Sequence, residues 1–528
     1  MPPKKQPKTP PEPINSKPRT PTKRKTAARR PARARPERAR RVEGPVERLR
    51  ILMAASEAHP FAKTGGLAEV LGALPAALAR LGHDVTVVLP RYRGVDVSGA
   101  SRVAHTFALG GRGVAADFVE VALADGVRAV LVDVPALFDR DGLYGSNGRD
   151  YPDNAWRFAV LSHAALEYAR LKGVRPSVLH AHDWQTGLLP VYQKMHFARD
   201  AVVGGVPCVF TIHNVAFQGV FPSPVLPPLG LGPEMLDLEA MEFWGQVNFL
   251  KGGLNFSEKL TTVSPTYARE ILTPEYGFGM EGVLRRRAGD LTGILNGIDI
   301  ARWNPETDEF VPAHFTADDL SGKRAAKRAL LETLGLPAGP HVVDRPVIGL
   351  ISRLTDQKGF DLIAAAAVDL MSLDAAWTML GSGEPRYETL WRALAARHPD
   401  RVSATIGFDE RLAHLIEAGA DMFLMPSRFE PCGLNQLYSL RYGTVPVVRA
   451  TGGLQDTIVD ASTPDGNGFK FSDYTPAAMV GGLRRALETY RDREGWVRLQ
   501  RTGMNRDSSW DVSAREYVKV YRGMINSQ

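Results

Sequence analysis

Cysteine is nearly absent from this chain of 528 residues, which contains only Cys208 and Cys432. Two cysteines cannot form a disulfide framework, so the reducing cytosol is the simplest setting. No apolar run approaches the roughly 18 residues of a membrane span, and the first residues lack the apolar core of a secretory signal. We therefore expect a cytoplasmic protein with no membrane partner. A hydrophobic content of 44% is typical of a globular chain, and this length suits two or three domains.

Excess positive charge is confined to the first 48 residues. They contain 16 Lys and Arg, 4 Glu and 11 Pro, a net charge of +12, whereas the whole chain carries +7, which leaves −5 for residues 49–528. With no aromatic and few large aliphatic side chains, residues 1–48 cannot offset the entropy of ordering, and we predict a disordered basic tail. Three interpretations stay open: an arm that contacts a polyanion such as RNA or DNA, a solvated extension, or a start codon assigned too far upstream.

Short β-branched runs alternate with helical stretches from residue 50 onward, in two successive series. This pattern predicts an α/β protein with two doubly wound sheets. The first series of expected strands comprises residues 51–55, 85–90, 129–134, 178–181 and 208–212. The second comprises residues 347–351, 377–380, 402–406, 422–425 and 445–448. We expect the join near residues 295–299 and a terminal helix with the apolar stripe Trp510, Ala514, Tyr517, Tyr521 and Met524.

A glycine-led helix start follows the first expected strand, in the run KTGGLAEV. Gly65 and Gly66 would let a ligand approach the backbone and the free amides of the helix start, and Lys63 adds a positive charge beside them. This combination suits a phosphate or a polarised sugar oxygen. Taken alone, the same run is equally consistent with a turn that carries a surface lysine.

A second cationic loop, SRLTDQKG, follows the expected strand 347–351. Arg353 and Lys358 precede Gly359 and a new helix, an arrangement that fits a diphosphate, although an ordinary solvated loop has the same composition. Glu430 follows another expected strand and could accept hydrogen bonds from sugar hydroxyls. A third glycine-led helix start, Thr451-Gly452-Gly453, comes shortly after it.

The run HAHDW supplies His180, His182 and Asp183, and TIHN supplies His213. Alternation along a strand places the first two histidines on one face, so a metal site is conceivable there. No further set of metal-ligating residues has the spacing to complete it. We therefore expect no metal, and we interpret His213 either as a core residue or as a residue of the site.

Nine segments in the same order resemble the bacterial glycogen synthases, the ADP-glucose-using family that also includes the plant starch synthases. The resemblance covers essentially all of residues 50–525. The segments are KTGGLAEVLGALP, HAHDWQTGLLP, TIHNVAFQG, VSPTYARE, GMEGVL, LNGID, SRLTDQKG, SRFEPCGLNQLY and RATGGL.

This resemblance implies a GT-B fold with two Rossmann-like domains facing a cleft. The expected parts are the tail at 1–48, an acceptor-side domain at 49–296, a nucleotide-sugar-binding domain at 297–506, and a C-terminal helix at 507–528 that packs back on the first domain. The implied reaction transfers glucose from ADP-glucose to the nonreducing end of an α-1,4-glucan such as glycogen, with retention at the anomeric carbon. No metal or other cofactor is implied.

The resemblance also assigns roles to residues of this chain. It places Asp183 and His213 at the glucosyl group, Arg353 and Lys358 at the leaving diphosphate, and Glu430 at the sugar hydroxyls. Further contacts to the donor are implied for Lys63, Gly65, Gly66, Glu69, Asn296, Phe408, Cys432, Gly433, Thr451 and Gly452. The sequence departs from the usual family pattern at two of these positions, because Glu69 replaces Asp and Phe408 replaces Tyr. Tyr438 stands where many related transferases have a second Glu, so we do not expect a pair of catalytic carboxylates.

Three alternative functions bear on these motifs. The nearest is a retaining transferase of the same fold that uses UDP-glucose or a different acceptor. A dinucleotide-dependent oxidoreductase would need a GxGxxG run after the strand 51–55, and that run is missing. A polyanion-binding module with a vestigial enzyme is disfavoured by the full set of expected donor-site cations.

Overall fold

A computed structural model describes residues 47–339 and 343–527. The tail predicted at 1–48 therefore lies outside the described residues, except for its last two positions. In the described part of the chain, no helix combines the length and the apolar character that crossing a bilayer requires.

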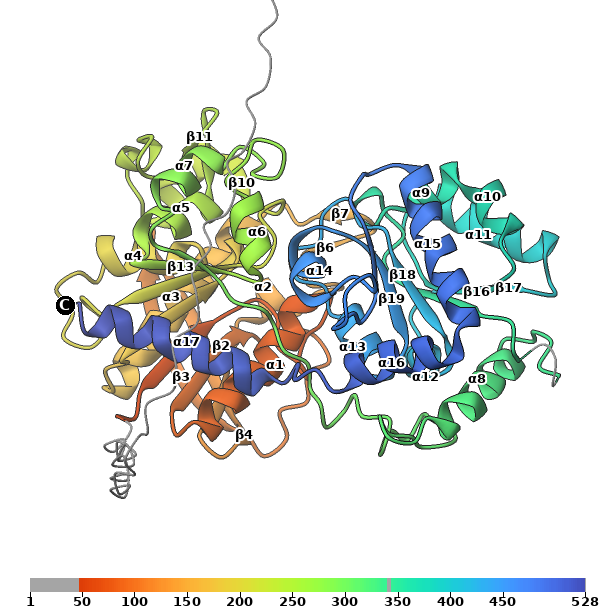
Figure 1. Ribbon diagram of the computed structural model, residues 1–528. Coiled ribbons are helices and arrows are strands. Elements are labelled where there is room, and N and C mark those ends of the chain that lie inside the picture. Colours follow the sequence, from red (N-terminus) through yellow and green to blue (C-terminus); the bar gives the residue numbers. More distant parts are fainter. Residues whose placement is uncertain (1–46, 340–342, 528) are drawn as a thin grey trace, which may run out of the picture. The chain divides into compact units, whose positions relative to one another are not determined.

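The first sheet has nine strands in the order β14-β13-β9-β8-β1-β2-β5-β4-β3 (Figure 1). From β14 to β5 all neighbours are parallel, and β4 and β3 form an antiparallel hairpin at the edge. The strands are β1 (Arg50–Ala54), β2 (Asp84–Pro90), β3 (Ser101–Leu109), β4 (Arg112–Ala124), β5 (Val127–Asp133), β8 (Val178–His182), β9 (Cys208–Ile212), β13 (Lys259–Thr262) and β14 (Leu291–Gly293).

Helices cover both faces of this sheet because consecutive residues of its central strands are apolar, so that apolar side chains point to both faces. Leu52 and Ala54 of β1 belong to one buried cluster, and Ile51 and Met53 belong to another on the opposite face. The helices of this half are α1 (Gly66–Arg80), α2 (Pro135–Phe138), α3 (Asn154–Lys172), α4 (Leu188–Met195), α5 (Phe249–Phe256), α6 (Pro265–Glu270) and α7 (Glu281–Arg286).

Two small sheets accompany the first one. The ribbon β10-β12-β11 is antiparallel, and so is the pair β6-β7. Their bounds are β6 (Gly145–Ser146), β7 (Arg149–Asp150), β10 (Val220–Pro222), β11 (Glu242–Phe243) and β12 (Gln246–Asn248).

The second sheet has six strands, all parallel, in the order β17-β16-β15-β18-β19-β20. They are β15 (Val347–Ile351), β16 (Ala376–Gly381), β17 (Val402–Ile406), β18 (Met422–Met425), β19 (Val445–Arg449) and β20 (Phe469–Phe471). The accompanying helices are α8 (Ser321–Thr333), η5 (Asp356–Lys358), α9 (Phe360–Ala365), α10 (Ala367–Ser372), α11 (Pro385–Arg397), α12 (Glu410–Gly419), α13 (Asn435–Arg441), α14 (Gly452–Thr457), α15 (Pro476–Arg491) and α16 (Arg493–Met504).

Both sheets reverse their strand order at one point, which confirms the two predicted doubly wound sheets. The second sheet has the Rossmann order 3-2-1-4-5-6, with the reversal between β15 and β18. In the first sheet the reversal lies between β1 and β8. Ligands of open α/β sheets bind beyond the carboxyl ends of the strands at such a point. A ligand site is therefore expected at the loops that follow these four strands.

Five strands of the two large sheets were not predicted from the sequence. The edge strands β3 and β4 have many exposed residues and so form no continuous apolar run. The other three, β13, β14 and β20, have only three or four residues each and contain polar side chains. Each gains its place by pairing with a longer parallel neighbour, which is a tertiary effect.

The terminal helix α17 (Trp510–Ile525) packs against the first sheet and not the second (Figure 1). Its buried residues share a cluster with Leu71 and Leu74 of α1 and with Met53 of β1. The hydroxyl of Tyr521 lies 2.9 Å from Nδ1 of His180 on β8. The helix therefore connects the end of the chain to the strand that carries the two histidines of HAHDW.

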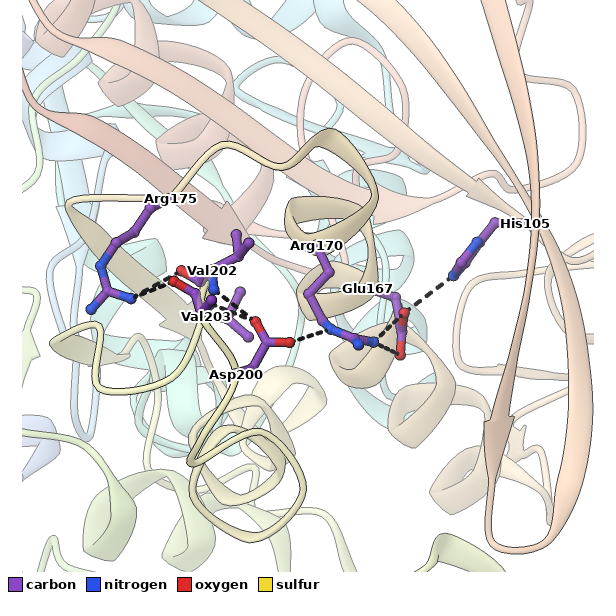
Figure 2. A network of polar contacts seen from close by, with 8 residues as sticks. His105, Glu167, Arg170, Arg175, Asp200, Val202 and Val203 are labelled. Atoms are coloured by element: carbon purple, nitrogen blue, oxygen red, sulfur yellow. Dashed lines mark hydrogen bonds and ion pairs between the residues drawn. The ribbon is translucent and has the colours of Figure 1, made fainter.

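A polar network braces α3 on the first half (Figure 2). Arg170 donates to Glu167 at 2.8 Å and to Asp200 at 2.7 Å, and Glu167 also lies 3.2 Å from a ring nitrogen of His105. Asp200 accepts from the backbone amides two and three residues after it, and Arg175 donates to carbonyl oxygens of the same loop. The network fixes the loop that leads from α4 to β9.

Candidate functional site

A cavity of about 1270 Å³ is lined by loops that follow strands of both large sheets. Eleven of the fifteen site residues expected from the sequence line it: Gly65, Gly66, Asp183, His213, Asn296, Arg353, Lys358, Phe408, Glu430, Cys432 and Gly433. A smaller cavity of about 200 Å³ shares the two glycines and Phe408 and adds Lys63 and Glu69. The remaining two, Thr451 and Gly452, line neither cavity.

The start of α1 presents bare backbone to the cavities. A Cβ added at Gly65 or at Gly66 would meet no heavy atom within 4 Å. The glycines are therefore not required by packing, and their lack of side chains leaves room for a ligand to approach the helix start.

A carboxylate that the sequence analysis did not single out lies beside this helix start. Glu57 accepts from the backbone amides of Thr64 at 2.5 Å and Gly65 at 3.3 Å, and it also accepts from the hydroxyls of Thr64 and Tyr144. Glu57 is buried and lines the larger cavity. Its position shortly after the carboxyl end of β1 is the sequence feature that could have identified Glu57 as a site residue. It holds the KTGG turn in place and offsets part of the positive potential there.

Lys63 is paired within the protein. Its ammonium donates to the carboxylate of Glu69, one turn into α1. Both groups line the smaller cavity together with Arg302, whose guanidinium pairs with Glu410 of α12. The smaller cavity is thus lined by two ion pairs, and the exposed side chain of Phe408 lines both cavities.

Asp183 follows β8 directly and has a positive φ of 55°. This conformation is sparsely populated for a residue other than glycine, and such positions are frequent at functional sites. The carboxylate accepts a hydrogen bond of 2.7 Å from the backbone amide of His213. Burial raises the pKa of Asp183 to about 7, although the hydrogen bonds from the amides of His213 and Asn214 act in the opposite direction.

The histidines of this region bond to one another and to hydroxyl groups. Nδ1 of His182 lies 3.0 Å from Nε2 of His213, and Nε2 of His180 lies 2.6 Å from the hydroxyl of Thr211. Burial lowers the pKa of His213 to about 3, so the ring is neutral near pH 7 and one of the two facing nitrogens donates to the other. No group of three or more His, Cys, Asp or Glu within the described ranges is arranged to hold a metal ion.

The second sheet contributes the cations. Lys358, in η5, donates to both carboxylate oxygens of Glu430 at 2.9 and 2.6 Å, and the hydroxyl of Ser427 donates to the same carboxylate at 2.9 Å. Arg353 is exposed on the loop after β15, and its guanidinium has no hydrogen-bond or ion-pair partner among the described residues. One cation is therefore held by a buried carboxylate, and the other is available to an anion in the cavity.

Thr451 and Gly452 bond to the first half of the chain. The Thr451 hydroxyl and the Gly452 amide both donate to Glu270 of α6, at 2.9 and 3.0 Å. In return, Asp456 of α14 accepts from the amide of Thr266, at the start of α6. Gly452 has φ of 44°, and a Cβ there would lie 1.9 Å from the carbonyl oxygen of Glu430. The third glycine-led helix start thus packs beneath the Glu430 loop and caps α6 reciprocally.

The geometry suits a neutral polyol joined to an anionic leaving group. Arg353, Lys358 and the open start of α1 offer positive potential to phosphates, and Glu430, Asp183 and Asn296 offer oxygens to hydroxyl groups. The lining combines polar groups with aromatic rings, as ligand cavities at such strand ends commonly do.

Two family models match the chain. Residues 50–286 match the starch synthase catalytic domain, and residues 337–501 match the glycosyl transferases group 1. Among curated proteins, the glycogen synthase of Anaeromyxobacter dehalogenans is 54% identical over 477 residues, which are 90% of this chain and 99% of that protein. The glycogen synthase of Koribacter versatilis is 49% identical over 477 residues, with 90% and 98% coverage.

Solved structures are also similar to this chain. The catalytic domain of starch synthase IV from Arabidopsis thaliana, bound to ADP and acarbose, superposes with a TM-score of 0.84 at 34% identity. The match covers 91% of this chain and 100% of that one. Sucrose-phosphate synthase from Thermosynechococcus elongatus matches with a TM-score of 0.59 at 17% identity, which shows a shared fold alone.

Proposed function

Because this chain is a glycosyltransferase of the glycogen synthase family, we propose that it transfers glucose from ADP-glucose to the nonreducing end of an α-1,4-glucan, with retention of configuration. The observation that carries this proposal is the gathering of Arg353, Lys358, Glu430 and the open α1 start around one cavity. The starch synthase that superposes on the chain is bound to ADP, which supports an adenine nucleotide as the donor. We assign residues 297–506 mainly to the donor and residues 49–296 to the glucan.

In the proposed reaction the bond between the anomeric carbon and the β-phosphate oxygen breaks, and its electron pair leaves with ADP. The 4-hydroxyl of the terminal glucosyl unit forms the new bond on the same face of the sugar and gives its proton to the departing phosphate. Negative charge grows on the diphosphate, beside Arg353 and Lys358. One preorganised contact of this kind commonly contributes about 3–4 kcal/mol, or roughly 10²–10³ in rate.

The other site residues support the sugar. Glu430 is held rigidly by Lys358 and Ser427, so its oxygens are fixed for hydroxyl groups. Asp183 and His213 are placed at the glucosyl group in this proposal, and the ring of Phe408 at the adenine. The ring of Phe408 is exposed and lines both cavities, which suits stacking on a flat base. Both cysteines are free and buried, which favours the cytoplasmic setting.

The test measures incorporation of labelled glucose into glycogen from ADP-glucose and from UDP-glucose. We expect a higher kcat/KM with ADP-glucose than with UDP-glucose. The product should be degraded by α-1,4-specific amylases. Because the glucosyl group of ADP-glucose is α-linked, retention predicts that NMR shows an α-linkage in the product. Activity should also persist in EDTA, since side chains are assigned to neutralise the phosphates. Equal kcat/KM for the two donors would favour the alternative transferase, and loss of turnover that a divalent ion restores would contradict the assignment of the phosphates to side chains.

A further inference from the structure

Exposed aromatic rings are concentrated around the larger cavity. Four Phe and Trp side chains are more than a third exposed within the described ranges, namely Phe217, Trp244, Phe278 and Phe408. Phe217, Phe278 and Phe408 line the cavity, and Phe408 is already assigned to the donor. Trp244 is the most exposed of the four, at 83%, and does not line it. Large apolar groups left in water at one place commonly mark a binding surface.

The backbone at Trp244 is held in an unfavourable conformation. The residue occupies the turn between β11 and β12 with φ of 53°, a left-handed value that is rare for a bulky side chain. The turn is fixed by a hydrogen bond of 2.8 Å from the Gly245 amide to Glu242. The ring of Phe243 meets the indole edge-on, with 6.2 Å between centroids. Asparagine or glycine would relieve the strain, so packing alone does not explain a tryptophan here.

Trp244 is connected to the cavity through a short series of contacts. The ring of Phe243 lies against Gly279, where an added Cβ would come within 3.0 Å of it, and Gly279 follows Phe278 directly. Gln218, which lines the cavity, donates to the carbonyl oxygen of Phe278 at 2.8 Å. The same side chain accepts from Asn248 of β12 at 2.7 Å. The ribbon β10-β12-β11 thus begins at the cavity wall, where Val220 of β10 lies, and ends at β11.

We propose that Trp244 is the outer platform of an aromatic path that starts at Phe217 and Phe278 and binds α-1,4-glucan chains several units behind their reacting ends. The proposal rests on the proposed function, because only a polymeric acceptor leaves sugar units outside the cavity. A glucosyl ring has an apolar C–H face and a rim of hydroxyls. It can therefore stack on an exposed indole while its hydroxyls stay in water. The path needs no charged group, as befits a neutral polymer.

The test uses the full chain and three variants. Trp244→Asn removes the ring and suits the left-handed backbone, so it keeps the turn. Trp244→Tyr restores an aromatic ring. The matched control is Val368→Asn, which changes an apolar side chain that is 86% exposed on α10, among the helices of the second sheet. Binding is measured without any donor, as retention of each protein in native gels that contain glycogen. Kinetics are measured with glycogen and with a short malto-oligosaccharide.

We expect Trp244→Asn to weaken retention and to raise the KM for glycogen by about threefold to tenfold, the range of one aromatic stacking contact. The KM for ADP-glucose and the kinetics with the short acceptor should stay as in the wild type. Trp244→Tyr should recover most of the loss, and Val368→Asn should show none.

Three results would overturn the path: wild-type retention and KM in Trp244→Asn, an equal loss in Val368→Asn, or a change in sedimentation that marks Trp244 as a contact between copies. Absence of retention in the wild type would also overturn it. Retention is measured without a donor, so it does not depend on which nucleotide sugar the enzyme uses. If the wild type does not use ADP-glucose and Trp244→Asn still loses retention, the proposed donor is refuted and the path stands.

Discussion

At the scale of single residues, the site is distinguished by which charges are paired inside the protein. Lys63 is bonded to Glu69, and Lys358 to Glu430, so each cation keeps a fixed position. Arg353 has no such partner among the described residues. Substitutions of these three cations should therefore differ in their effects on stability, even though all three are expected to contact the donor.

Arg353→Ala should lower kcat with ADP-glucose by roughly 10²–10³, the usual effect of removing one charge that stabilises a leaving group. The apparent melting temperature should stay unchanged, because the side chain is exposed and holds nothing in place. Steady-state kinetics and calorimetry measure the two effects. The matched control is Arg392→Ala on α11, where only an exposed pair with Glu388 is lost. Near-normal turnover in folded Arg353→Ala would remove this residue from the mechanism.

Asp183→Asn should change how stability depends on pH. The Asp183 carboxyl loses its proton near pH 4 when the chain is unfolded but only near pH 7 when folded, since burial raises its pKa to about 7. The folded state therefore binds the extra proton between these values, and wild-type stability falls as pH rises through this window.

The Asn variant cannot titrate, so its free energy of unfolding should gain on that of the wild type by up to about 3 kcal/mol between pH 5 and pH 8, which appears as a relative rise in melting temperature. Asparagine keeps an oxygen that can accept from the His213 amide, which preserves the turn. Calorimetry at pH 5, 6 and 8 on both proteins measures the difference. A difference that does not vary with pH would contradict the raised pKa.

At the scale of elements, the glycine-led starts of α1 and α14 have different roles. At α1 the glycines leave open space beside the cavity, whereas at α14 they let the helix approach the Glu430 loop and bond to Glu270. The element α17 is equally decisive, because it covers α1 and β1 from the far end of the chain.

Tyr521→Phe should loosen α17 by about 1–3 kcal/mol, because Nδ1 of buried His180 loses its partner. The effect should appear as faster hydrogen exchange of the α17 amides, roughly tenfold for each 1.4 kcal/mol. Lys519→Ala, on the exposed side of the same helix, is the control and should change exchange little. Unchanged protection in Tyr521→Phe would show that the hydrogen bond does not hold the helix.

At the scale of the whole molecule, the charge is divided unevenly between the tail and the rest. Deleting residues 1–48 should leave kcat and the melting temperature unchanged, because the family match begins at residue 50 and the first strand begins at Arg50. If the tail is a functional arm, the full chain should bind nucleic acid or another polyanion with an affinity that falls steeply as salt rises.

The shortened protein, whose residues 49–528 carry −5, should show no such binding. Electrophoretic mobility shifts at several salt concentrations compare the two proteins. Mass spectrometry of the native N-terminus decides whether residue 1 is retained. A loss of turnover in the shortened protein would show that the tail is needed.

The sequence by itself determined the two doubly wound sheets, and eleven of the fifteen site residues expected from it line the larger cavity. The reason is local: buried parallel strands are continuous apolar runs, and site residues follow their carboxyl ends, as Asp183 follows β8 and Arg353 follows β15. Only the tertiary structure decided which groups meet. The pairing of Lys358 with Glu430, 72 residues away, and of Thr451 with Glu270 depends on the packing of distant elements, which no local spacing encodes. The same is true of Glu57 at the α1 start and of Trp244, whose left-handed backbone and exposed ring become apparent only once the ribbon has folded beside the cavity.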